Sequence, residues 1–175
     1  MSELIVVTGP PGAGKSTLAA RLVTLFELSA LVAGDEFFAF VRQGYVEPWR
    51  SEAHAQNEVV IAAAAAAAGH LVAGGYTVVY DGVVGPWSLP GFATGAGLAR
   101  LHYAMLLPKE QICQGRVRSR SGHGFTDLDA AAHMYREFAS APIDHRHVLT
   151  DDDLDQNVAD VLSRIRESSI VWSAP

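Results

Sequence analysis

The sequence predicts an α/β fold in which a doubly wound, parallel sheet of five strands carries helices on both faces. Three observations support this prediction. Short apolar runs rich in β-branched residues alternate with helical segments from one end of the chain to the other. These runs are continuous, as in strands that are buried on both faces. No repeat, linker or low-complexity segment divides the chain, so we expect one domain over residues 1–175.

The individual elements follow from the apolar runs and from the helix signals between them. The strands are expected at residues 4–8, 28–33, 76–80, 101–107 and 147–149. Helices are expected at residues 14–27, 35–43, 48–74 and 150–166. The longest of these carries Ile61 and seven alanines after it, and alanine has the highest helix propensity. Pro108 suits the first turn of another helix, and Thr126 with Asp129 is typical of a capping box that opens a further one.

The composition argues against several classes of protein. Hydrophobic residues make up 49% of the 175 residues and charged residues 18%, as in a globular protein. The net charge of −6, with no run of Lys or Arg, makes nucleic acid a poor partner. We see no secretion signal and no apolar stretch long enough to cross a bilayer, so we expect a cytoplasmic protein without a membrane partner. Cys113 is the single cysteine and is expected to be an ordinary buried thiol; the oligomeric state stays open between monomer and homodimer.

A glycine-rich segment joins the first strand to the first helix. It reads Gly9-Pro10-Pro11-Gly12-Ala13-Gly14-Lys15-Ser16 and fits G-x-x-x-x-G-K-[ST] at every fixed position. In such a P-loop the backbone N–H groups and the helix N-terminus bind phosphate oxygens. Lys15 can reach the β and γ phosphates of ATP, Ser16 can ligate Mg²⁺, and Thr17 is placed to contact the nearer phosphates. The sequence therefore predicts a P-loop NTPase that uses ATP and Mg²⁺.

Two aspartates follow the next strands, where ligands of parallel sheets bind. Asp81 ends the strand at 76–80 and is expected to hold the metal, although an Asp-Gly pair is also a common turn. Asp35 ends the strand at 28–33 and is our candidate general base for an attacking hydroxyl. The alternative for Asp35 is an N-cap of the helix that follows. Both carboxylates are expected to flank the γ-phosphate, as phosphoryl transfer requires.

A candidate lid lies at about residues 116–126. Arg116 and Arg120 are four residues apart and precede a glycine-flanked loop with His123, to which we assign no chemistry. A lid of this kind closes over the phosphates, supplies positive charge and excludes water. The alternative is a solvated basic helix end.

Two loops shaped by Gly and Pro carry aromatic residues just after the two aspartates. Trp49 lies in the segment 44–50, and Trp87 lies in the segment 85–87. Arg42 is seven residues past Asp35, on the same face of the helix expected there. Together these residues suggest a pocket with aromatic walls for the acceptor substrate.

With the loop, Asp35 and the lid identified, the chain resembles the small-molecule kinases of the P-loop superfamily, which have a nucleoside-monophosphate-kinase-like fold. Gluconokinases are closest in layout, with shikimate kinases and chloramphenicol phosphotransferases more distant. The segment from Arg116 to Phe125 is similar to a gluconokinase lid. The resemblance implies that Arg116 stacks on adenine and that Arg120 binds phosphate. Glu36-Phe37-Phe38 departs from the gluconokinase pattern, which argues against gluconate as the acceptor.

These observations predict an enzyme that moves the γ-phosphate of ATP to a hydroxyl of a small molecule, such as a sugar acid or an antibiotic. The catalytic residues are expected to be Lys15, Asp35 and Arg120. A nucleotide or polynucleotide kinase is one alternative, against which the acidic charge counts. A nucleotide-binding switch or ATPase without an acceptor is another, and it would leave Asp35 and the aromatic pocket without a purpose.

Overall fold

The structure, a computed structural model, describes residues 2–119 and 125–174. Its sheet has the strand order β2-β3-β1-β4-β5, with all neighbours parallel, and β6 pairs antiparallel with the start of β4. The strands are β1 (Leu4–Thr8), β2 (Ser29–Ala33), β3 (Thr77–Asp81), β4 (Arg100–Leu106), β5 (Val148–Leu149) and β6 (Val171–Ser173). The predicted parallel sheet of five strands is confirmed, and β6 adds an antiparallel strand that the sequence did not indicate.

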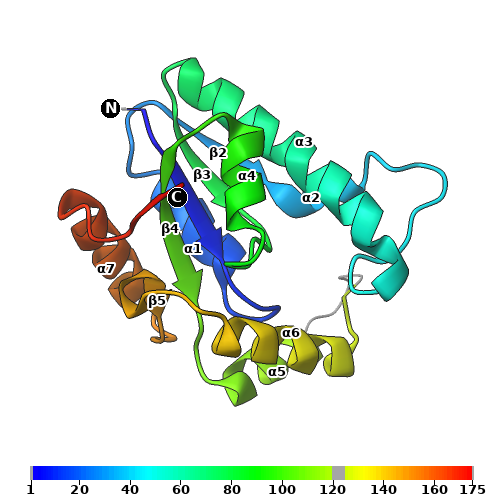
Figure 1. The fold of residues 1–175 in the computed structure, drawn as a ribbon. Coiled ribbons are helices and arrows are strands. Elements are labelled where there is room, and N and C mark those ends of the chain that lie inside the picture. Colours follow the sequence, from blue (N-terminus) through cyan, green and yellow to red (C-terminus); the bar gives the residue numbers. More distant parts are fainter. Residues whose placement is uncertain (1, 120–124, 175) are drawn as a thin grey trace.

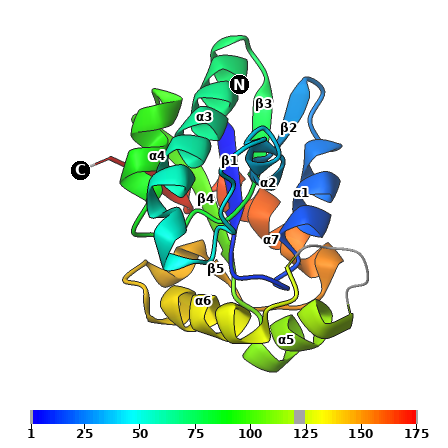
Figure 2. The ribbon, with the colours of Figure 1, turned by 90° about the vertical axis from the view of Figure 1, so that its right-hand side faces the viewer.

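Helices cover the two faces of this sheet (Figure 1). They are α1 (Lys15–Val23), α2 (Gly34–Phe38), α3 (His54–Ala73), α4 (Leu89–Ala96), α5 (Glu110–Ser119), α6 (Leu128–Ser140) and α7 (Leu154–Arg166), with 3₁₀ turns at Ser51–Ala53 and His145–His147. α1 and α7 pack together on one face, and α3 and α4 on the other. α5 and α6 lie beyond the carboxyl ends of the strands in both views (Figure 2). None of the described helices is long and apolar enough to span a membrane.

β1 lies between two hydrophobic cores, which explains why its sequence is continuously apolar. Leu4 and Val6 belong to the core under α3 and α4, whereas Ile5 and Val7 belong to the core under α1 and α7. All four side chains are buried. Alternate residues of a strand point to opposite faces, so a strand with helices on both sides needs apolar residues at every position.

α3 is slim, and this lets it approach α4 closely. Ala64, Ala65 and Ala68 are fully buried on the side that meets the sheet and α4. At Gly69 the approach is closer still, because a Cβ atom there would overlap the backbone carbonyl of Ala96 in α4. The alanine run therefore determines the distance between the two helices.

Several boundaries differ from the expected ones. α2 ends at Phe38 rather than at Gln43, and a left-handed Gly44 follows in the loop. α3 begins at His54, after Pro48 and a 3₁₀ turn, rather than at residue 48. The first helix ends four residues earlier than expected, at Val23.

The sequence analysis predicted neither α4 nor β6. α4 contains Pro90 and glycines that are typical of loops, but Pro90 lies in its first turn, where a missing N–H costs nothing. β6 is only three residues long, and such a short run at the end of a chain carries little pattern.

The close contact at Gly69 gives a prediction. Gly69→Ala should lower the free energy of unfolding by roughly 1–2 kcal/mol, because the overlap with Ala96 outweighs the better helix propensity of alanine. The control is Gly91→Ala in α4, where a Cβ meets nothing within 4 Å. That variant should be neutral or more stable by up to about 1 kcal/mol. Urea unfolding of both variants measures the difference, and equal effects would contradict the packing described.

Candidate active site

The loop between β1 and α1 has the curled backbone of a phosphate-binding loop. Gly9, Gly12 and Gly14 all have positive φ, at 143°, 81° and 100°. A Cβ at Gly12 would also overlap the backbone carbonyl of Cys113 in α5. Glycine is therefore required both by the curl and by close packing.

The first turn of α1 carries the polar residues that follow the glycines of the loop. Lys15, Ser16 and Thr17 form the first turn of α1, where the backbone N–H groups and the helix dipole attract anions. The Lys15 ammonium donates to the carbonyl oxygen of Pro10 at 3.2 Å, so it lies over the loop. This is the geometry for binding a polyphosphate.

Arg116, predicted to contact the nucleotide, lies against the phosphate loop. Its guanidinium donates to the carbonyl oxygens of Gly12 at 3.4 Å and Ala13 at 3.3 Å. A further hydrogen bond of 3.4 Å reaches the carbonyl oxygen of Asp152, just before α7. Arg116 therefore joins α5, the loop and the segment that follows β5. Arg120 and His123, the other residues singled out in the lid, lie outside the described residues.

Strand register brings the two predicted aspartates to the same edge of the sheet. Asp81 is paired with Val7 of β1 and with Ala33 of β2. Asp35 follows Ala33 by two residues, in the first turn of α2. The N-cap of α2 is Ala33, and no side chain caps this end of the helix. The alternative interpretation of Asp35 as an N-cap therefore does not describe this structure.

Tyr80 precedes Asp81 in β3 and packs against Gly34 at the start of α2, which carries Asp35. A Cβ at Gly34 would overlap the Tyr80 hydroxyl group, so glycine is needed where α2 starts. Burial raises the pKa of Tyr80 strongly, and the charges of Asp35 and Asp81 raise it further. The phenol therefore stays protonated at physiological pH and retains a hydrogen to donate.

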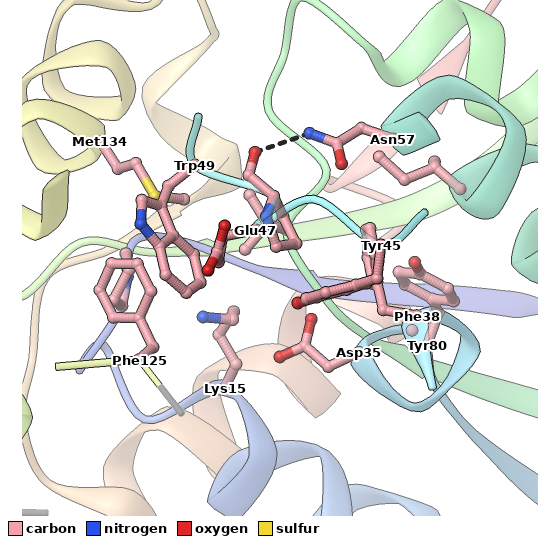
Figure 3. A pocket seen from close by; sticks show the side chains of 15 residues that line it. Lys15, Asp35, Phe38, Tyr45, Glu47, Trp49, Asn57, Tyr80, Phe125 and Met134 are labelled. Carbon is pink, nitrogen blue, oxygen red and sulfur yellow. Dashed lines mark hydrogen bonds between the residues drawn. The ribbon is translucent and has the colours of Figure 1, made fainter. Parts of the chain in front are cut away.

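A pocket of about 530 Å³ opens beside these groups (Figure 3). In Figure 3 the Lys15 ammonium, the Asp35 carboxylate and the Tyr45 hydroxyl face a common space. The full lining is Pro11, Lys15, Gly34, Asp35, Phe38, Tyr45, Glu47, Pro48, Trp49, Asn57, Ile61, Tyr80, Val83, Phe125 and Met134.

The structure brings together only some of the residues expected to contact an acceptor. Asp35 and Trp49 line the pocket, but Arg42 and Trp87 do not. Arg42 was expected on the same helix face as Asp35, yet α2 ends at Phe38 and leaves Arg42 in the loop beyond it. The Trp87 ring instead packs on Phe138 of α6, with ring centroids 5.2 Å apart.

The loop at residues 44–50 forms one wall of the pocket and is fastened to α3. Gln56 exchanges two hydrogen bonds with the backbone of Val46, at 2.9 and 2.7 Å. The Asn57 amide donates to the carbonyl oxygen of Pro48 at 2.7 Å. The Trp49 ring meets Phe125 edge to face, with centroids 4.8 Å apart. The wall is therefore positioned by contacts from both sides.

Sequence reasoning missed Tyr45, Glu47 and Phe125 as individual pocket residues. Tyr45 and Glu47 belong to the aromatic loop that it did single out, which was the available signal. Phe125 becomes part of the pocket through its contact with Trp49, which is distant in sequence. Cys113 is buried and burial raises the pKa of its thiol, as expected of a structural cysteine.

The oxygen donors beside the loop suit a magnesium ion bound together with phosphates. Ser16 lies in the first turn of α1, and Asp81 ends β3. Within residues 2–119 and 125–174 no group of three His, Cys, Asp or Glu side chains is arranged to coordinate a metal ion. Mg²⁺ commonly takes one or two protein oxygens and completes its shell with phosphates and water, so this donor set fits it.

A family model described as AAA domain matches residues 4–141 of the chain. No curated protein matches the sequence. A tunicamycin resistance protein from Deinococcus radiodurans has a similar structure, with a TM-score of 0.68, 14% identity and coverage of 94% of this chain and 96% of that one. A gluconokinase from Sinorhizobium meliloti 1021 also has a similar structure, with a TM-score of 0.62 and 17% identity. The match covers 96% of this chain and 95% of that one.

A chain of the Pnkp1/Rnl/Hen1 RNA repair complex also shares the fold, with a TM-score of 0.60 and 14% identity over all of this chain and 49% of that one. At sequence identities of 14–17%, the similarity of this chain to these structures shows only that they share a fold. Together with the family match it confirms the resemblance to P-loop kinases that the sequence indicated, whereas the acceptor is not decided by it.

The contacts of Arg116 give a prediction about the loop. Arg116→Ala should lower the free energy of unfolding by roughly 1–2 kcal/mol, because it removes hydrogen bonds to the carbonyls of Gly12, Ala13 and Asp152. Amide exchange in the loop should also become faster. Arg118→Ala, at an exposed position of the same helix, is the control and should change neither quantity. Identical exchange in the two variants would show that Arg116 does not support the loop.

Proposed function

The chain belongs to the AAA domain family, and we propose that it is an ATP-dependent phosphotransferase with a small-molecule acceptor. The observation that carries the proposal is the pocket that Lys15 of the phosphate loop and Asp35 line together. It puts a phosphate-binding cation and a candidate base around one space, at the carboxyl ends of the parallel strands.

The nucleotide half of the site would consist of the phosphate loop and Arg116. Loop N–H groups and the N-terminus of α1 bind the phosphates, and Lys15 places its charge on the β and γ phosphates. Ser16 and Asp81 would hold Mg²⁺, which neutralises charge on the phosphates when it is bound. Arg116 stacks on adenine, and Arg120 of the proposed lid contacts the transferring phosphate.

Transfer itself requires an acceptor hydroxyl in the pocket. The hydroxyl oxygen attacks the γ phosphorus and forms the new P–O bond, while the bond from that phosphorus to the β–γ bridging oxygen breaks and ADP leaves. The hydroxyl proton passes to the Asp35 carboxylate, which releases it to solvent. Because Arg42 and Trp87 do not line the pocket, the acceptor contacts proposed here rest on Asp35 and Trp49.

A small acceptor fits the site better than a polynucleotide does. The pocket has a volume of about 530 Å³ and carries the carboxylates of Asp35 and Glu47, which would repel a phosphodiester chain. We propose that the chain acts as one catalytic domain over residues 1–175.

The test is a screen for ADP release from ATP and Mg²⁺ in the presence of metabolites, antibiotics, nucleosides and oligonucleotides. Stimulation by a small hydroxylated compound, with transfer confirmed by mass spectrometry, is the expected result. Stimulation by oligonucleotides alone would replace the proposal with a polynucleotide kinase. Slow hydrolysis that no acceptor changes would favour a nucleotide-dependent switch.

Lys15→Ala should weaken ATP binding by at least tenfold, because it removes the charge placed on the β and γ phosphates. Isothermal titration calorimetry with ATP and Mg²⁺ measures the affinity. Lys109→Ala is the matched control, since Lys109 is exposed and precedes α5. Unchanged ATP affinity in Lys15→Ala would remove the phosphate loop from the proposal.

Asp35→Asn should lower acceptor-dependent turnover by roughly 10²–10⁴-fold, the usual contribution of a positioned general base. ATP affinity and the thermal midpoint should stay close to those of the wild type, because Asp35 caps no helix. Glu36→Gln, at the exposed next position and outside the pocket lining, is the control. If Asp35→Asn retains turnover, the base must be another group.

A further inference from the structure

The acceptor side of the pocket combines aromatic rings with negative charge. Among the residues that the structure describes there, the aromatic ones are Phe38, Tyr45, Trp49, Tyr80 and Phe125. The acidic ones are Asp35 and Glu47, and Lys15 is the single basic side chain of that lining. In the proposed site the positive charge of Lys15 interacts with the phosphates of ATP. It therefore does not neutralise the two carboxylates where the acceptor would bind.

Both carboxylates act on the same region of the pocket. In the view of Figure 3 the Glu47 carboxylate lies between the Trp49 indole and the Asp35 carboxylate. The pKa of Tyr45 is raised, first by partial burial and then by the charges of Glu47 and Asp35. The Tyr45 hydroxyl therefore experiences the negative potential of both groups, which places them around one space rather than at opposite ends of the molecule.

Glu47 has a partner outside the pocket, but that partner is shared. Arg50 lies 3.6 Å from Glu47 and 3.7 Å from Glu52, and its side chain is about half exposed. One guanidinium between two carboxylates leaves an excess negative charge, and an exposed ion pair of this length is weak. Glu47 can therefore still attract a cation into the pocket.

Asn57 supports the same wall from α3. Its amide nitrogen is occupied by the carbonyl oxygen of Pro48. Its side-chain oxygen is buried and makes no hydrogen bond within the described part of the chain. The acceptors that face the pocket on this side are therefore the carboxylate oxygens of Glu47 and Asp35, and a ligand rich in donors would complement them.

We propose that the phosphoryl acceptor is a hydroxylated compound that carries a protonated amine, with the ammonium group at Glu47 and Trp49 and the reacting hydroxyl at Asp35. The inference rests on the proposed function and specifies its substrate class. A carboxylate attracts the ammonium group, and the faces of the aromatic rings attract it as well. An acceptor with a carboxylate of its own, such as a sugar acid, would be repelled by the same two groups.

The experiment compares amines with their uncharged counterparts. A panel of hydroxylated amines, including D-glucosamine, D-galactosamine and neamine, is assayed beside the fully N-acetylated form of each, with D-gluconate as the acidic member. Two readouts are taken: acceptor-stimulated ADP release, and equilibrium binding by calorimetry in the presence of Mg²⁺ and a non-hydrolysable ATP analogue. The best acceptors should be amines, and N-acetylation should raise KM and Kd at least tenfold.

Glu47→Gln tests the residue itself. It should raise the KM and Kd of the best amine at least tenfold, while the KM for ATP and the binding of the N-acetylated form stay within twofold. Glu52→Gln is the matched control, because Glu52 contacts the same Arg50 but does not line the pocket. Equal effects of the two substitutions would overturn the role of Glu47.

The two readouts separate this inference from the proposed function. If a neutral or acidic compound is the best acceptor and Glu47→Gln leaves its KM unchanged, the inference is wrong although the phosphotransferase stands. If amines bind in a Glu47-dependent way but no compound is phosphorylated, Glu47 binds amines, but the phosphotransferase is wrong and the amine is not a phosphoryl acceptor. If no amine of the panel binds, the inference is overturned.

Discussion

The parallel pairing of β1 with β3 and β4 is the constraint on which the site depends. It sets Val7 opposite Asp81, and Thr8 opposite Met105, so that the phosphate loop and Asp81 leave the sheet at the same level. Two buried hydrogen bonds secure this arrangement. The Val84 N–H donates to the Thr8 hydroxyl at 2.9 Å, and the Tyr103 hydroxyl donates to the Val84 carbonyl at 2.7 Å. Leaving such groups unpaired would cost about 1–3 kcal/mol each, so the loop after β3 stays attached to β1 and β4.

The nucleotide and acceptor sides of the proposed site have opposite electrostatic character. On one side lie the first turn of α1 with Lys15, and Arg116 against the loop carbonyls. On the other lie Asp35 and Glu47 among aromatic rings. A phosphate chain is attracted to the first side and repelled by the second. In the proposed enzyme this charge distribution would give each substrate a separate place, although the chain as a whole carries a net charge of −6.

The sequence was sufficient for features that depend on local pattern. The phosphate loop is read from eight consecutive residues, and the parallel sheet from runs that are apolar at every position, so both were predicted. The position of Arg42 was not, because it depended on how far α2 extends, and the helix ends at Phe38 before a left-handed glycine. The wall at residues 44–50 depends on Gln56 and Asn57, and its contact with Phe125 joins residues far apart in the chain. Propensity and spacing carry no information about contacts of this kind.

The position of Asp35 depends on packing that begins far from the pocket. The small side chains of α3 let α4 approach to the point where Gly69 touches the carbonyl of Ala96. α4 in turn places Phe92 against the Tyr80 ring, with centroids 4.6 Å apart. The Tyr80 hydroxyl lies where a side chain at Gly34 would be, so α2 can start there only with glycine, and Asp35 is the next residue. An alanine run that has no chemistry of its own thus helps to fix the carboxylate proposed to receive the proton. A larger side chain on the inner face of α3 would move α4 and, through Phe92, Tyr80, so a substitution at a position outside the pocket lining would alter the site.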